Sequence, residues 1–256
     1  MTNVVVAPKN IAKPTQAEIA DVYRSTASER VWYANWYRYR NDEDVRRGIG
    51  ARVLYHVPED ANGKPVQRLE SIKPEHQKYW CYLGRGALAA LRFIGAEWRK
   101  ELEKQTIDPN NELRLAYTSL LRTVERQREI VADGVLAVDE STHEVGQAFD
   151  TDASSYYRRL PTGRYQSIPH PDRPPKLVVA IGDGLRPSNQ IEDTTPEPRP
   201  DLYDPRVTDA LLTVGSRLAE TGLINHVIEF AGTANQCVHA APNLQANFAD
   251  RLRIDA

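Results

Sequence analysis

An amphipathic stretch between Glu75 and Gln105 constrains the fold more than any other part of this 256-residue chain. Its apolar residues recur at steps of three and four, which places them along one side of an α-helix. The residues on that side are Trp80, Leu83, Ala87, Ala90, Leu91, Ile94, Trp98 and Leu102. Because a helix with such a side must bury it, we expect this helix to be a core element.

Patterns elsewhere in the chain predict both helices and strands, and therefore an α+β fold. Helices are expected over residues 15–49, 121–134 and 206–222. Strands are expected over residues 52–57, 113–120, 176–182, 224–230 and 237–241. The last two strands flank AGTANQ and should pair as a β-hairpin. Ten of the 17 prolines lie between residues 160 and 205, so we expect an insertion there rather than a core segment.

The composition suits a globular protein that needs no disulfide framework. Hydrophobic residues make up 41% of the chain and charged residues 27%, enough for one large domain or two small ones. The two cysteines, Cys81 and Cys237, lack the CxxC spacing of a redox or zinc-finger site.

Charge and the N-terminus limit the expected partners. A net charge of -2 provides no long-range field toward nucleic acid or an anionic membrane, so neither is expected as a partner. The N-terminus lacks the pattern of a signal peptide, and no window approaches the roughly 18 apolar residues of a membrane span. We therefore expect a cytoplasmic protein, unless it is incorporated into a phage particle or exported by a separate machine.

The stretch STHEVGQAFD contains two residues that could bind a metal ion. His143 can offer an imidazole nitrogen and Asp150 a carboxylate oxygen. Their odd separation would place them on opposite faces of a regular strand, so a turn or bulge must intervene, and Gly146 is where we expect it. On spacing alone, a single histidine and aspartate in such a segment are more often structural.

The same stretch also fills every fixed position of an SxHxxGxAxD pattern, through Ser141, His143, Gly146, Ala148 and Asp150. It therefore resembles the signature of the D-alanyl-D-alanine metallopeptidases. This family includes the vancomycin-resistance dipeptidases and carboxypeptidases and several phage endolysins. The resemblance implies that His143 and Asp150 bind zinc and that Ser141 helps to hold the substrate.

A second run, SLLRTVERQ, lies upstream of the first and resembles the family's SxxRSxxxQ. The resemblance gives Arg122 the role of the arginine that holds substrate and polarises the scissile carbonyl, and Gln127 closes the motif. Without the resemblance, Arg122 would be read as a solvated helix residue.

The family's third zinc ligand is a histidine near the C-terminus, in an ExxH pattern whose glutamate is the general base. The segment QCVHAA is similar and places His239 in the ligand position. Gln236 stands where the family has glutamate, and an amide cannot accept a proton at neutral pH. The resemblance therefore still implies zinc binding, but the residue that usually serves as the base in hydrolysis is missing.

The predicted hairpin offers a replacement for that base. If residues 230 and 236 close its loop, Glu229 lies opposite Cys237 and shares a face with it and with His239. Glu229 would then lie near the metal, whereas a one-residue slip would make it a surface glutamate. Cys237 is either a small core residue or a fourth metal donor.

The resemblance spans residues 112–242 and implies a fold and a function. The fold is α+β, with a small antiparallel sheet that carries the zinc site and helices packed on one face. Residues 1–70 would form a helical N-terminal extension, and residues 71–256 a zinc-peptidase-like domain with an insertion at 160–205. The implied function is a zinc peptidase of D-Ala-D-Ala carboxypeptidase or endolysin type, acting on peptidoglycan stem peptides or other D-amino-acid peptides. The alternative is a non-catalytic zinc-binding structural or binding module of a phage particle or other assembly.

Overall fold

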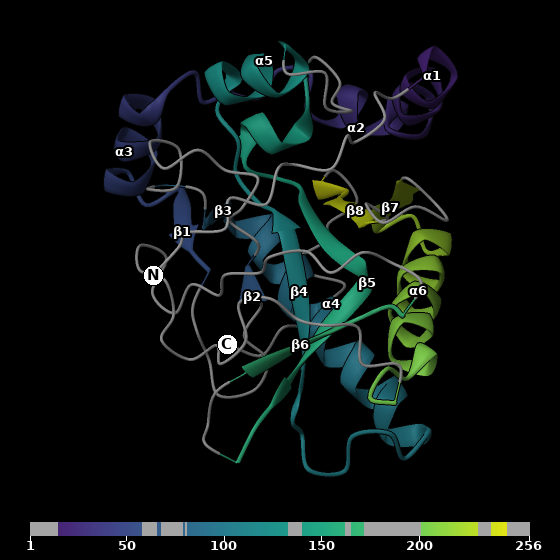
Figure 1. The fold of residues 1–256 in the computed structure, drawn as a ribbon. Coiled ribbons are helices and arrows are strands. Elements are labelled where there is room, and N and C mark those ends of the chain that lie inside the picture. The colour runs from purple at the N-terminus through teal and green to yellow at the C-terminus, as the bar shows by residue number, and fades with distance from the viewer. Residues whose placement is uncertain are drawn as a thin grey trace, which may run out of the picture.

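A computed structural model describes residues 15–57, 66–67, 79, 81–132, 140–161, 165–171, 201–229 and 237–244. Within these residues a six-stranded sheet forms, with strand order β2-β4-β5-β8-β7 and β6 also paired with β5 (Figure 1). Its strands are β2 (Val66–Gln67), β4 (Leu113–Ser119), β5 (Phe149–Arg159), β6 (Tyr165–Pro169), β7 (Ile224–Glu229) and β8 (Cys237–Pro242). All described pairs are antiparallel except β2 with β4. A separate two-stranded sheet contains β1 (Leu54–His56) and β3 (Tyr82–Gly84).

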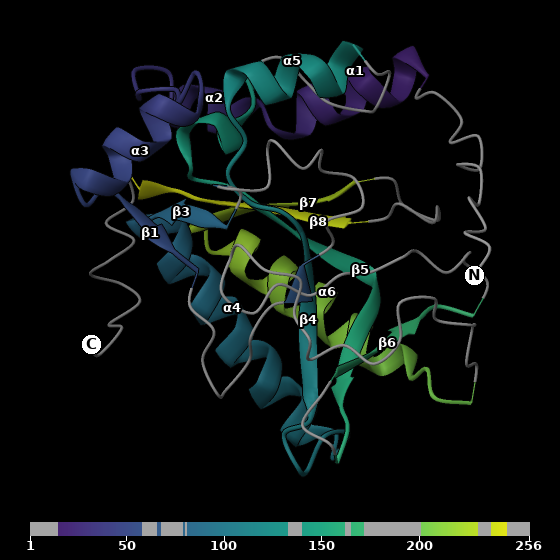
Figure 2. The same cartoon turned by 60° about the vertical axis from the view of Figure 1, so that its left-hand side comes forward.

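Helices lie on both sides of the large sheet (Figure 2). Helices α4 (Arg85–Lys104) and α6 (Pro205–Glu220) pack against each other and against one face, where they bury the main hydrophobic core. On the opposite side lie α1 (Gln16–Ser25), α2 (Ala27–Trp32) and α5 (Val124–Ala132). Helix α3 (Asp42–Gly50) packs against β1. The predicted α+β class, with a small and mainly antiparallel sheet and N-terminal helices, is confirmed.

The core helix is shorter than its apolar pattern predicts. Residues 82–84 pair with β1 as a strand, so α4 begins at Arg85 and Leu83 belongs to β3. From Ala87 to Leu102 the predicted apolar side is buried, and the Trp98 indole N–H donates to the Val207 carbonyl of α6 at 3.0 Å. Trp80 lies outside the described residues.

Two other helix predictions also ran too long. Residues 15–49 form three helices rather than one, and the segment before α3 leaves the helix because its backbone bonds to distant segments. Tyr39 donates its N–H to the Glu144 carbonyl at 2.8 Å and accepts from the Val124 N–H at 2.9 Å. The second contact also fixes the start of α5, which begins at Val124 rather than at residue 121. The predicted strand at 176–182 and the hairpin loop lie outside the described residues.

Strand β6 lies within the proline-rich range 160–205, and it pairs with β5 along its length. Its Ile168 is fully buried in the main core. The first part of that range therefore belongs to the sheet.

The register of the β7–β8 hairpin agrees with the prediction. Glu229 lies opposite Cys237, and Val227 lies opposite His239. The alternate residues Val238 and Ala240 belong to the core formed with α4 and α6, so His239 faces the opposite side. His226 lies on the core side, where its ring occupies the space that a Cβ on Gly215 would need.

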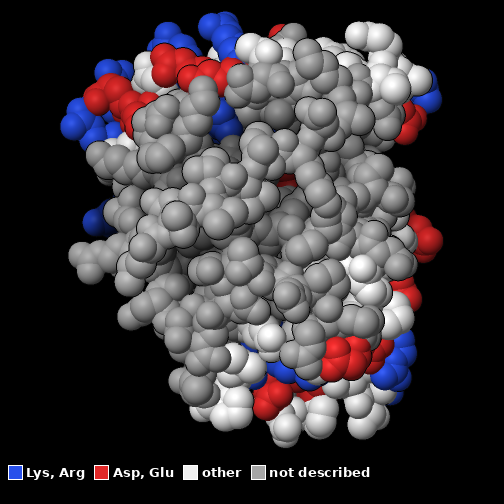
Figure 3. All heavy atoms as spheres, viewed as in Figure 1, with Lys and Arg blue, Asp and Glu red and all other residues white. Residues whose placement is uncertain are grey.

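Charged side chains of both signs are interspersed on the face shown in Figure 3, most clearly around α3. There Glu43 pairs with both Arg46 and Arg47. In the part of the chain that the structure describes, no helix combines the length and apolarity needed to cross a membrane.

Candidate metal centre

Three strands bring the centre of the site together. Asp150 on β5 lies directly opposite Ser119 on β4 and directly opposite His239 on β8. Cross-strand partners share a face, so these three side chains point to the same side of the sheet. The neighbour of Asp150, Phe149, is buried in the core on the other face. The site therefore lies on the side of the sheet away from α4 and α6.

His143 reaches the same point from a short 3-10 turn, η2 (Thr142–Val145), just before β5. Ser141 caps this turn, since its Oγ accepts from the His143 backbone N–H at 3.3 Å. Gly146 ends it with φ +69°, a left-handed conformation that favours glycine. The expectation that a turn at Gly146 separates the two donors is confirmed.

The motif loop is anchored to the start of the core helix. The Gly146 carbonyl accepts from the Gly84 N–H at 2.7 Å. The Gln147 side chain accepts from the Ala87 N–H at 3.1 Å, which satisfies a donor in the first turn of α4. The longest helix thus holds the loop that carries His143.

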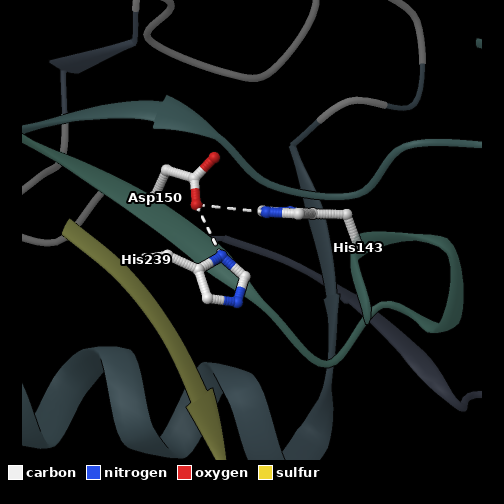
Figure 4. A group of neighbouring side chains, drawn as sticks. All are labelled: His143, Asp150 and His239. Carbon is white, nitrogen blue, oxygen red and sulfur yellow. Dashed lines mark hydrogen bonds and ion pairs between the residues drawn. The ribbon is translucent and has the colours of Figure 1, made fainter. Parts of the chain in front are cut away.

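The donor atoms converge on one carboxylate oxygen (Figure 4). Asp150 Oδ1 lies 3.1 Å from His143 Nε2 and 2.9 Å from His239 Nδ1. The three residues are 2%, 4% and 3% exposed for His143, Asp150 and His239 respectively. The structure therefore brings together the three metal ligands that the sequence predicts.

The positions of the protons on the two histidine rings explain why this cluster could hold a cation. His143 Nδ1 lies 2.6 Å from the Leu120 carbonyl, which can only accept, so Nδ1 carries the proton and Nε2 of the neutral ring is an acceptor. His239 Nε2 likewise faces the carboxylate of Glu29, which leaves Nδ1 of the neutral ring as an acceptor. With both rings neutral, both inner nitrogens face an acceptor oxygen of Asp150. A positive ion among them would satisfy all three.

Protonation of the histidines would remove only part of the repulsion between these facing acceptor atoms. Burial lowers the pKa of His239, but Glu29 and Asp150 outweigh it and hold that pKa well above its ordinary value. His143 behaves differently, because burial and the nearby Arg122 lower its pKa. A proton therefore covers the contact between His239 and Asp150, while the contact between His143 and Asp150 keeps two facing acceptors.

Arg122 lies in the loop between β4 and α5, and its guanidinium joins the residues of the second motif. It donates to Ser119 Oγ at 2.7 Å, to Gln127 Oε1 at 3.1 Å and to Asp150 Oδ2 at 3.0 Å. Its side chain is mostly buried and does not lie on a helix. Arg122 thus holds Asp150 through the oxygen that the histidines do not contact.

Glu229 and Cys237 lie one step further along the same face. The Cys237 thiol donates to Glu229 Oε2 at 3.6 Å, and donor atoms of Asp150, Glu229 and Cys237 lie within 4.8 Å of one another. Burial, followed by the charge of Asp150, raises the pKa of Glu229 to about 7. Burial and Glu229 also raise the pKa of the Cys237 thiol, which disfavours the thiolate that a metal donor requires. Gln236 lies outside the described residues.

Sequence reasoning missed one residue of the site, Glu29 in α2. It is fully buried, and its carboxylate oxygens lie 3.1 and 3.0 Å from His239 Nε2. It also accepts from the Thr142 hydroxyl and the Asn225 amide. The helical spacing of Thr26, Glu29 and Tyr33, which share one buried face, could have predicted the burial of Glu29 but not its contact with His239.

Nitrogen and oxygen donors of this kind fit a divalent first-row metal ion.

Comparison with protein-family models, with curated proteins and with solved structures finds no match for this chain. A pocket adjoins the cluster, and its walls come from α1 and α2, from the motif loops and from β7 and β8. It is lined by Val22, Thr26, Glu29, Arg30, Arg122, Gln127, Glu140, Ser141, Thr142, His143, Glu229 and His239.

Proposed function

We propose that His143, Asp150 and His239 bind zinc, and that the chain is a zinc-dependent peptidase acting on peptidoglycan stem peptides. The observation that carries this proposal is the convergence of three donor atoms whose outer partners keep both inner nitrogens available. Two histidines and one carboxylate are a donor set that leaves a zinc position open for chemistry. When bound, the ion would supply Lewis acidity to polarise a carbonyl group and acidify water.

Glu229 is the residue that we propose as general base. Its carboxyl lies beside Asp150, and its pKa of about 7 lets it take up and return a proton at neutral pH. Glu229 therefore supports hydrolysis without the glutamate that Gln236 replaces in the family pattern.

Arg122 and Ser141 are proposed to hold the substrate. Both line the pocket that reaches His143 and His239. The Arg122 guanidinium would stabilise negative charge on the carbonyl oxygen or bind the terminal carboxylate of a peptide. The Ser141 hydroxyl would add a hydrogen bond to the same group.

Digestion of purified muropeptides, followed by chromatography, tests this function. Zinc-loaded wild type should release D-alanine or cut a stem-peptide cross-link, and His143→Ala should not. Absence of cleavage by the wild type under every metal loading would contradict the peptidase proposal and leave the metal site standing.

A second function, a non-catalytic zinc-binding module of a phage particle or other assembly, is favoured by the burial of the ligands. All three are less than 5% exposed, and the N-terminal helices lie on the same side of the sheet as the site. A structural zinc site of this kind would raise thermal stability and leave muropeptides intact.

A further inference from the structure

We infer that Glu29 is a positioning residue of the metal centre, so that the N-terminal helices are part of that centre rather than a separate extension. The inference rests on the zinc-binding part of the proposed function and does not require peptidase activity. Helix α2 would thereby fix the orientation of His239 through Nε2, the ring nitrogen that does not face Asp150.

The environment of Glu29 is built for a charged carboxylate. Among the described residues, its hydrogen-bond donors are Thr142, Asn225 and His239, and Arg or Lys is not one of them. A buried carboxylate without a compensating positive charge is costly. A cation bound at the inner nitrogen of His239 would supply that compensating charge.

The geometry assigns Glu29 a specific effect on the ligand. When His239 is neutral, as a metal ligand must be, the carboxylate accepts from Nε2–H and leaves Nδ1, the nitrogen that faces Asp150, without a proton. It also orients the ring and raises the basicity of Nδ1 toward a metal. The outer ring nitrogen of His143 is oriented in the same way, but by the neutral carbonyl of Leu120. Among the described contacts of the two outer nitrogens, Glu29 is therefore the anionic partner.

Further contacts link α1 and α2 to the strands that carry the site. The Tyr33 hydroxyl donates to the Pro242 carbonyl at the end of β8. Asn225 on β7 donates both to Glu29 and to the Ser25 carbonyl, the latter at 3.0 Å. Because coupling between two binding events is reciprocal, docking of α2 should strengthen metal binding, and metal binding should stabilise the docked helices.

Zinc affinity, measured by competition with a chromophoric chelator, tests the role of Glu29. Glu29→Gln keeps the size of the side chain and one acceptor oxygen but removes the charge, and it should weaken zinc binding roughly 10–100-fold. Glu144→Gln is the matched control. Glu144 is also buried and adjoins His143, but its carboxylate pairs with Arg38 at 2.8 Å, so its loss should change zinc affinity little.

Two readouts separate positioning from a general loss of structure. The cobalt-substituted Glu29→Gln protein should keep a four-coordinate visible spectrum with shifted bands, because the basicity of His239 changes. Hydrogen exchange should show that zinc protects α1 and α2 in the wild type more than it protects α6, and that Glu29→Gln removes most of this difference.

A milder variant covers the case in which Glu29→Gln fails to fold. Asn225→Leu removes one donor to Glu29 without changing a charge, and it should lower zinc affinity in the same direction by a smaller factor. Wild-type zinc affinity and a wild-type cobalt spectrum in each variant that folds would overturn the inference, and Asn225→Leu alone decides where Glu29→Gln does not fold. None of these measurements uses a peptide substrate. A failure of this inference can therefore be distinguished from an absence of peptidase activity.

Discussion

Asp150 and His239 lie directly opposite each other on β5 and β8, with Oδ1 and Nδ1 2.9 Å apart. The hydrogen-bond register of the sheet alone thus aligns two of the three donors. His143 is added by a turn that only a left-handed residue at position 146 completes. The site is therefore a product of strand pairing and one glycine.

The three ligands should make zinc binding stoichiometric. We expect about one zinc per chain in purified protein, measured by elemental analysis, and far less after His143→Ala or His239→Ala, because two donors hold the ion poorly. Well under one equivalent in the wild type, without a gain on reconstitution, would show that the cluster is not a zinc site.

Asp150→Asn should reduce zinc affinity more than Glu144→Gln. The first change removes the charge of a ligand, whereas the second affects a carboxylate that pairs with Arg38. We expect a loss for Asp150→Asn above the roughly 10–100-fold typical of a ligand's hydrogen-bond partner. Isothermal titration on both variants measures it, and equal losses would mean that Asp150 is not a ligand.

The grouping of His143, Asp150 and His239 was predicted through a motif resemblance, which local sequence patterns carry. His143 and Asp150 lie in one short motif, and Glu229 and His239 belong to one hairpin whose register follows from a short loop. Glu29 could not be placed in the same way. Its contact with His239 joins residues 210 positions apart, and such a contact leaves no local spacing pattern.

Periodicity also misplaced the start of the core helix. Leu83 lies at a helical step from Ala87, yet residues 82–84 pair with β1. Burial is satisfied either way, because Leu83 is fully buried in the strand. An apolar pattern therefore identifies which residues are buried more reliably than which backbone they adopt.

Stability in acid should depend on His226. Burial, with a contribution from His239, lowers its pKa in the folded chain from 6.5 to about 4. Between these pH values the unfolded chain binds more protons, so the free energy of unfolding should decrease as the pH falls through this window. The loss from His226 is on the order of 3 kcal/mol at most.

Urea unfolding of the metal-free wild type and of His226→Gln at several pH values isolates this effect, because all other groups titrate in both proteins. The difference between their free energies of unfolding should change between pH 6.5 and 4 and then level off. Parallel curves across this range would show that His226 does not titrate with a lowered pKa.

The identity of the general base gives the sharpest test of catalysis. Glu229 lies among the donor groups with a pKa of about 7, whereas position 236 carries an amide. If Glu229 accepts the proton, the wild type cleaves a D-Ala-D-Ala peptide and Glu229→Gln lowers kcat on the order of 10²–10⁴-fold with zinc retained. Gln236→Glu should then gain little, because a second carboxylate nearby would raise the pKa of the first.

A nearly inactive wild type that Gln236→Glu activates, with unchanged zinc content, would instead show that position 236 is the site of the base. Assays of all three proteins on one peptide, with zinc measured in each, distinguish the two outcomes.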